Sequence, residues 1–241
     1  ISGTHGKTTT SSLVTWILKY AKLNPSYLIG GQPINLNSPA KLTSSNFFII
    51  EADEYDTSFF DKRSKYIHYH PNILVINNIE FDHADIFENI DSVVKNFHHL
   101  VRIVPKNGKI IYNYDDKNIR KLIKKGIWSK EISMTSKNYK SANWSLSKKG
   151  NSFFLSKIKA KTSSSKMIES SLLGIHNYKN ISLAILASMQ AGVSFSMCIN
   201  AIKKFKGVKR RMEKVENKGM LQIYDDFAHH PTEIESSIKS L

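Results

Sequence analysis

Short apolar runs alternate with amphipathic segments along the first half of the chain. Four consecutive apolar residues occupy 47–50, a second run lies within 73–79, and a third lies within 109–113. Runs without a polar face predict strands buried on both sides, as in a parallel sheet that is covered by helices. The pattern therefore predicts an α/β fold with a doubly wound, mostly parallel sheet flanked by helices.

Helices are predicted where apolar side chains recur at three- and four-residue spacing, which is typical of a helix that buries one face. The segments with this spacing are residues 8–22, 91–104, 115–124, 181–192 and 196–205. In the first of them, Leu13, Trp16, Ile17 and Tyr20 are expected to face inward.

The pattern changes between residues 131 and 173, where short alternating segments replace the long helices. Residues 144–147 and 153–155 flank Gly150 and Asn151, and turn residues between alternating segments indicate paired strands. We expect a small antiparallel appendage here, with the serine-rich tract 163–166 as a loop.

A second pattern begins near the end of the chain. Residues 207–213 are interpreted as a linker, residues 220–224 as a strand, and Pro231 suits the first turn of a closing helix. We therefore predict a central domain over residues 1–208. Residues 209–241 are predicted to be a linker and the beginning of a second α/β domain, which we expect to be incomplete.

Two glycines, a lysine and a run of threonines open the first predicted helix. Glycines let backbone N–H groups converge, and a helix N-terminus adds positive potential, so residues 3–10 predict a phosphate-binding loop. Lys7 is expected at the β- and γ-phosphates and the Thr8 hydroxyl at Mg²⁺. The generic motif has a glycine where this chain has Ile1, so an ordinary glycine-rich turn remains an alternative. Such loops follow a strand, yet only two residues precede Gly3, so we expect a fragment cut near that strand.

Carboxylates follow two of the predicted strands directly. Four acidic residues lie within 51–56, and Glu80, Asp82, His83 and Asp85 follow the second strand. In open α/β sheets ligands bind at the carboxyl ends of the strands, and oxygen ligands there suit the cation that accompanies a nucleotide. Both clusters are expected at the same edge of the sheet as the phosphate loop. The alternative is that each is a solvated acidic turn.

The charge of the chain would ordinarily suggest a nucleic-acid partner. The formal net charge is +15 and the isoelectric point is about 9.7, values that are typical of nucleic-acid-binding proteins. The excess is nearly all scattered lysine, and arginine, which is preferred for phosphate and base recognition, occurs at only five positions. This distribution argues against nucleic-acid binding.

The remaining composition indicates a soluble protein. No apolar run approaches the roughly 18 residues that a membrane span needs, so no membrane partner is expected. The single cysteine, Cys198, lies among apolar residues, which predicts a buried structural thiol. A reducing cytoplasm fits this cysteine usage.

Two asparagines stand just before the fourth helical segment. Asn177 and Asn180 are spaced to face the same side at a helix start, so their amides could read a base edge or cap the helix. Capping is the common explanation for a single asparagine, and it explains a pair less well.

Six motifs, taken in chain order, resemble the Mur ligase family, the ATP-dependent enzymes that form amide bonds in peptidoglycan synthesis. They are residues 3–8, 51–54, 77–83, 174–180, 209–213 and 225–233. The resemblance covers nearly the whole chain, and the short form of the phosphate loop is the family's own. It also implies that an N-terminal UDP-sugar domain and most of a C-terminal domain are absent from this chain.

The resemblance implies a role for each matching residue. Lys7, Thr8 and Glu51 would serve the ATP phosphates and a first Mg²⁺, and His83 would bind a second Mg²⁺. The remaining ATP contacts would come from Gly3, Thr4, His5, Gly6, Thr9, Asn177, Asn180, Arg211 and Asp226. His98 stands where several relatives carry a carbamylated lysine, so a carbamate is not assumed.

The implied activity is amide-bond formation through an acyl-phosphate, in peptidoglycan recycling. Residues 51–65 and 81–87 most resemble members that join L-alanyl-γ-D-glutamyl-meso-diaminopimelate to UDP-N-acetylmuramate. The members that use L-alanine instead share the motif 229–233 but normally lack a segment like 61–65. A nucleotide- or nucleic-acid-binding module without ligase activity is the alternative of another class.

Overall fold

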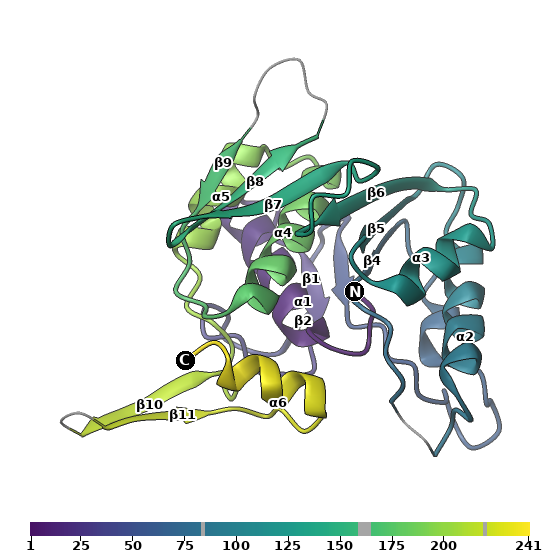
Figure 1. Ribbon diagram of the computed structural model, residues 1–241. Helices are drawn as coiled ribbons and strands as arrows, with labels where there is room; N and C mark the ends of the chain where they lie inside the picture. Colours follow the sequence, from purple (N-terminus) through teal and green to yellow (C-terminus); the bar gives the residue numbers. More distant parts are fainter. Residues whose placement is uncertain (83–84, 159–164, 219–220) are drawn as a thin grey trace. The chain divides into compact units, whose positions relative to one another are not determined.

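The computed structural model describes residues 1–82, 85–158, 165–218 and 221–241 (Figure 1). The chain forms two compact units. The first contains residues 1–7 and 51–166, and the second contains residues 8–50 and 167–241. The predicted boundary at residue 208 stays a prediction.

The first unit is built on a six-stranded sheet with the strand order β4-β5-β6-β7-β8-β9, of which β9 begins at the last residue of this unit. The strands are β4 (Ile73–Ile76), β5 (Lys109–Asn113), β6 (Lys130–Thr135), β7 (Trp144–Lys149), β8 (Ser152–Lys157) and β9 (Lys166–Ile168). Neighbours from β4 to β7 run parallel, and β7 and β8 are antiparallel. The predicted α/β fold with a mostly parallel sheet is confirmed.

The antiparallel pair around Gly150 is confirmed, but it is not a separate appendage. β7 continues the parallel sheet through β6, with Met134 opposite Trp144. The pair therefore extends the main sheet. The predicted loop at 163–166 lies mostly outside the described residues, and Lys166 begins β9.

Two helices cover β4 and β5 in the first unit, and they lie side by side (Figure 1). They are α2 (Ile90–Arg102) and α3 (Lys117–Lys124). Asn89 caps α2 by accepting from the Ser92 N–H, and Asp116 caps α3. Their inward apolar residues join those of the strands in one core, in which Phe97, Leu100 and Ile110 are fully or almost fully buried. The short helix η1 (Lys65–His68) adds Tyr66 to the same core.

The second unit combines a three-stranded sheet, a two-stranded sheet and helices. Its sheets have the orders β2-β1-β3 and β10-β11. Their strands are β1 (Ser26–Leu28), β2 (Ala40–Lys41), β3 (Phe48–Ile50), β10 (Glu213–Lys218) and β11 (Leu221–Asp225). The helices are α1 (Lys7–Tyr20), α4 (Ile175–Gln190), α5 (Phe195–Lys203) and α6 (Pro231–Ile238), of which α1 begins at the last residue of the first unit.

Two predictions about burial in this unit need correction. Phe48 in β3 is 56% exposed, so the run 47–50 is not buried on both faces. In α1 the first half is buried nearly all round, whereas Trp16 and Tyr20 remain partly exposed. Ser11 and Ser12 tolerate burial because their hydroxyls donate to the Thr8 carbonyl, at 3.1 and 2.6 Å.

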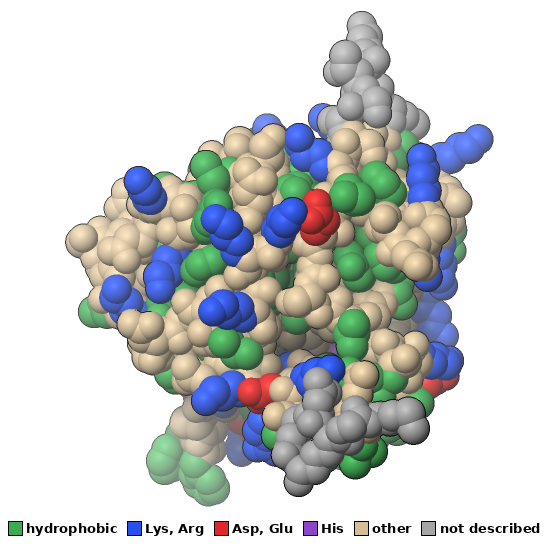
Figure 2. Space-filling view, turned by 90° about the vertical axis from the view of Figure 1, so that its left-hand side faces the viewer, with side chains coloured by type: hydrophobic (Ala, Val, Ile, Leu, Met, Phe, Trp, Pro, Cys, Tyr) green, Lys and Arg blue, Asp and Glu red, His purple; other side chains and the backbone are tan. Residues whose placement is uncertain are grey.

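The single cysteine lies in the core, as the sequence predicts. Cys198 is fully buried, and burial raises the pKa of its thiol to about 12, so the structural thiol is confirmed. None of the described helices is both long and apolar enough to cross a bilayer. On the face drawn in Figure 2, the lysine and arginine side chains lie scattered among other types of side chain.

Candidate functional site

The loop at the start of the chain is held against the end of β4. Ser2 pairs in parallel with Ile76. Its N–H donates to the Val75 carbonyl at 2.8 Å, and its carbonyl accepts from the Asn77 N–H at 3.0 Å. The Ala52 N–H donates to the Ile1 carbonyl at 2.7 Å, which brings the backbone beside Glu51 to the same place. The carboxyl ends of two predicted strands therefore meet at the loop.

The two glycines of the loop have left-handed backbone conformations, with φ of 127° at Gly3 and 76° at Gly6. A Cβ on Gly3 would lie 3.0 Å from the Asn78 carbonyl oxygen and 3.1 Å from the Asn77 backbone nitrogen. Side chains avoid both that conformation and that contact with backbone. Gly3 is thus required by the close approach of the loop to the residues after β4.

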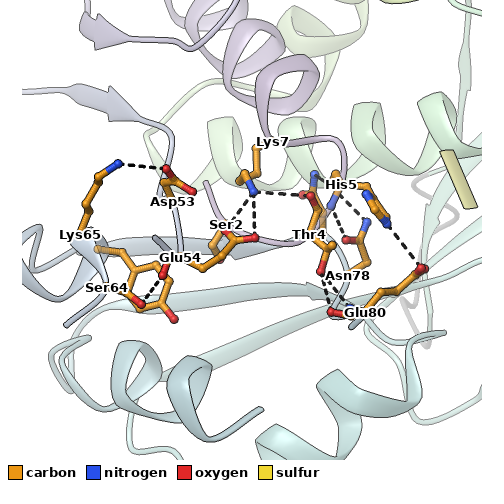
Figure 3. A network of polar contacts seen from close by, with 12 residues as sticks. Ser2, Thr4, His5, Lys7, Asp53, Glu54, Ser64, Lys65, Asn78 and Glu80 are labelled. Atoms are coloured by element: carbon orange, nitrogen blue, oxygen red, sulfur yellow. Dashed lines mark hydrogen bonds and ion pairs between the residues drawn. The ribbon is translucent and has the colours of Figure 1, made fainter. Parts of the chain in front are cut away.

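Asn78 fixes the backbone of the loop at His5 (Figure 3). Its Oδ1 accepts from the His5 N–H at 2.7 Å, and its Nδ2 donates to the His5 carbonyl at 3.2 Å. Thr4 adds a second link, because its Oγ1 accepts from the Glu80 N–H at 2.9 Å. The His5 ring lies 3.4 Å from the Glu80 carboxylate. The sequence analysis gives Asn78 no role, because it places this residue inside the predicted strand 73–79, whereas β4 ends at Ile76.

Lys7 forms an ion pair with Glu54, a partner that the sequence did not single out. The Lys7 Nζ lies 3.0 Å from Oε2 and 3.3 Å from Oε1 of Glu54, and it also lies 3.5 Å from the Thr4 carbonyl (Figure 3). Glu54 is only 3% exposed, so its carboxylate has little water around it. A buried carboxylate needs a charged partner, and Lys7 supplies one. Three other acids stand near Glu54 in the chain, so spacing alone did not single it out.

Acids from both clusters influence the side chain of Tyr55. Burial raises the pKa of Tyr55, and the carboxylates of Asp85, Asp53, Asp82 and Glu54 raise it further. Two of these acids follow the first predicted strand and two follow the second. Among the described residues, these four acids do not form a group whose oxygens are close enough together to share one cation. His83, predicted as a metal ligand, lies outside the described residues.

Thr8 and Thr9 lie in the first turn of α1 and are buried. The first N–H groups of a helix have no acceptors within the helix, and they carry its positive potential. The helix begins at Lys7, directly after the glycine loop, so this turn has the local geometry of a phosphate site.

The other predicted nucleotide contacts lie in the second unit. Asn177 and Asn180 are buried in the first turns of α4, and Asn177 donates to the Leu173 carbonyl at 2.7 Å. The N-cap of α4 is Gly174, so the capping alternative for the asparagines is wrong. Arg211 lies over the Phe227 ring, 5.4 Å from its centroid.

Asp226 lies close to the start of α4. Its Oδ2 accepts from the Ser237 hydroxyl at 2.5 Å. Burial lowers the pKa of His176, while the carboxylates of Asp226 and Glu233 partly oppose that shift. The second unit thus brings Asp226 and the helix start that carries the two asparagines to one region.

Comparison with known proteins gives concordant matches. Residues 1–188 match the model of the Mur ligase middle domain. The whole chain is 41% identical to a UDP-N-acetylmuramate–L-alanyl-γ-D-glutamyl-meso-2,6-diaminoheptandioate ligase of Escherichia coli K12, and it covers 52% of that protein. It is 34% identical over 255 residues to a UDP-N-acetylmuramate–L-alanine ligase of Caldicellulosiruptor bescii, and it covers 51% of that relative.

A solved structure agrees with these matches. The crystal structure of the UDP-N-acetylmuramate:L-alanyl-γ-D-glutamyl-meso-diaminopimelate ligase from Neisseria meningitidis superposes with a TM-score of 0.78 at 39% identity. The match covers 86% of this chain and 65% of that one. The chain spans about half the length of the curated relatives it matches.

Proposed function

This chain belongs to the Mur ligase family, and from that premise we propose that it is the ATP-binding region of a peptide ligase. The proposed enzyme joins UDP-N-acetylmuramate to L-alanyl-γ-D-glutamyl-meso-diaminopimelate at the expense of ATP. The single observation that carries the proposal is the phosphate-type loop, whose Lys7 is held 3.0 Å from the buried carboxylate of Glu54. The choice of amine substrate is supported by the 41% identity to the E. coli tripeptide ligase.

The residues present fit a nucleotide with its cation. The left-handed glycines and the first turn of α1 offer backbone N–H groups to phosphates, and Lys7 offers an ammonium group. Carboxylate, hydroxyl and imidazole groups are available for the cation, and we propose Thr8, Glu51 and His83 as ligands of Mg²⁺. When bound, Mg²⁺ would neutralise charge on the phosphates.

The proposed reaction has two steps. A carboxylate oxygen of the muramate attacks the γ-phosphorus of ATP, the bond to ADP breaks, and an acyl-phosphate forms. The α-amine of the peptide then attacks the acyl carbon, loses a proton, and displaces inorganic phosphate to leave the amide. No protein nucleophile is needed, and Lys7 contributes by neutralising and positioning the phosphoryl group.

Lys7 is expected to change partners when ATP binds. Without nucleotide, the Glu54 carboxylate is the counter-ion of Lys7. A bound triphosphate offers a denser negative charge, so we propose that Lys7 turns from Glu54 toward the phosphates. Asn78 and Thr4 keep the loop backbone in place during this exchange.

An assay of ADP release with the full-length protein tests this function. UDP-N-acetylmuramate is supplied first with the tripeptide and then with L-alanine. We expect the tripeptide alone to stimulate ADP release. Stimulation by L-alanine alone would instead indicate the activity named for the C. bescii relative, and stimulation by neither would contradict a ligase of this kind.

A further inference from the structure

A pocket of about 420 Å³ lies on the first unit, between α2 and the segment 62–67. The role proposed above does not use it. One face of α2 lines the pocket with Lys95, Asn96 and His99, and the facing segment contributes Arg63. The lining is therefore rich in cationic groups. No carboxylate is among the described residues that line it.

Two cations at the rim already have partners. Arg63 forms two bonds of 2.9 Å to the Asp61 carboxylate, and it holds the pKa of that group well below its usual range. Lys62 lies 3.0 Å from Asp56. Since these charges are balanced, they offer little attraction to a ligand.

Lys95 and His99 differ from the rim cations, because neither has an acidic partner within the described part of the chain. Lys95 is exposed at the pocket mouth. Burial lowers the pKa of His99, and the neighbouring side chains of Lys95, His98 and Arg102 lower it further. The Lys95 ammonium group therefore gives this end of the pocket a positive charge without an acidic partner among the described residues.

The remainder of the lining is apolar. Ile67, Phe87 and Ile103 line it, and Phe87 is only 8% exposed. An inorganic phosphate would leave this surface uncovered and would carry more charge than one ammonium balances. A single carboxylate on an aliphatic stem matches both the charge and the apolar walls.

The polar side of the pocket connects to the phosphate loop. Asn96 donates from Nδ2 to the Ser64 Oγ at 2.8 Å, and the Ser64 hydroxyl donates to the Glu54 carbonyl at 2.5 Å. Glu54 in turn holds Lys7. Two hydrogen bonds, through Ser64, therefore connect Asn96 to the backbone of Glu54. A ligand beside Asn96 would lie at the far end of this connection to Lys7.

We propose that this pocket binds an aliphatic carboxylate, with Lys95 as its counter-ion. Two sources carry that chemistry. One is a carboxylate of the peptide substrate, in which case the inference rests on the proposed function, and the other is a free amino dicarboxylic acid.

Calorimetric titration of the full-length protein, without ATP, tests the proposal. The probes are the tripeptide L-alanyl-γ-D-glutamyl-meso-diaminopimelate, free meso-diaminopimelate, and inorganic phosphate. In Lys95→Gln we expect binding of the tripeptide or of the free amino acid to weaken at least about tenfold, as for a lost hydrogen bond to a charged group. The matched control is Lys106→Gln, an exposed lysine outside the pocket, which should leave binding unchanged.

The outcomes separate cleanly. A Lys95 effect on the tripeptide alone identifies the substrate as the source, and an effect on meso-diaminopimelate identifies the free acid. Equal binding of both probes by wild type and Lys95→Gln would overturn the proposal, and so would Lys95-dependent binding of phosphate alone. Because no turnover is measured, failure of the ligase assay with intact Lys95-dependent binding would count against the proposed function only.

Discussion

The Lys7 ammonium group lies 3.0 Å from the Glu54 carboxylate, although 46 residues separate them in the chain. Glu54 is buried, and Lys7 is largely so. The pair holds the Lys7 ammonium group in a defined position at the phosphate loop. It also makes the loop and the segment after β3 depend on each other for stability.

Replacing only one partner of this pair should destabilise the protein. Lys7→Met leaves the Glu54 carboxylate buried without its counter-ion, and we expect the free energy of unfolding to fall by on the order of 3 kcal/mol. The double variant Lys7→Met/Glu54→Gln should recover most of that loss, because a neutral amide replaces the charge. Urea unfolding of both variants measures this. Equal losses in the single and double variants would show that the pair is not coupled.

The two loop glycines should respond differently to the same substitution. Gly3→Asn places a Cβ 3.0 Å from the Asn78 carbonyl at φ of 127°, and we expect a loss of at least about 2 kcal/mol. Gly6→Asn should fold, because asparagine adopts the left-handed region near φ of 76°. Thermal unfolding compares them. Similar melting temperatures for the two variants would contradict the close approach at Gly3.

Asn78 should matter for ATP binding through the His5 backbone. Asn78→Ala removes both bonds to His5, so we expect the KM for ATP to rise about tenfold, a change that corresponds to roughly 1.4 kcal/mol. Asn89→Ala is the matched control. It removes the cap of α2 at a cost of about 1 kcal/mol and should leave that KM unchanged. Steady-state kinetics at saturating UDP-sugar and peptide decide between these results.

His176 should make the second unit less stable in mild acid. Burial lowers its folded pKa below the unfolded value of 6.5, so the unfolded chain binds the proton more readily. The stability that neutral His176 contributes is therefore complete above pH 6.5 and is lost as the pH falls through the folded pKa. Urea unfolding at pH 7.5 and 5.5 should show a smaller loss for His176→Asn than for wild type. The exposed His70→Asn should behave like wild type, and an unchanged loss in His176→Asn would contradict the assignment.

Patterns among residues close together in the sequence predicted the strands and the glycine loop. Ile73–Ile76 was predictable as a strand because consecutive apolar residues need burial on both faces, and the glycines marked the loop. The pairing of Lys7 with Glu54 was not predictable from the sequence. Three other acids stand close by in the chain, and only the fold decides which one is buried. Asn78 was missed because it acts on backbone groups that no side-chain motif reveals.

The strands β2 and β10 show another limit. Ala40–Lys41 is short and exposed, and Glu213–Lys218 carries four charged side chains, so neither has an apolar pattern. Both form because a partner strand supplies hydrogen bonds, β1 in one case and β11 in the other. Pairing of this kind depends on tertiary context and leaves little trace in the sequence.

The central claim is that the region around Lys7 serves carboxylate activation by ATP. It is tested most directly with UDP-N-acetylmuramate whose carboxylate carries ¹⁸O in both oxygens, incubated with the full-length protein, ATP and the tripeptide. We predict that mass spectrometry finds one ¹⁸O in each inorganic phosphate released and one in the amide product, and that Lys7→Ala lowers phosphate release at least about 100-fold. Released phosphate without ¹⁸O, or near-normal turnover in Lys7→Ala, would contradict the account.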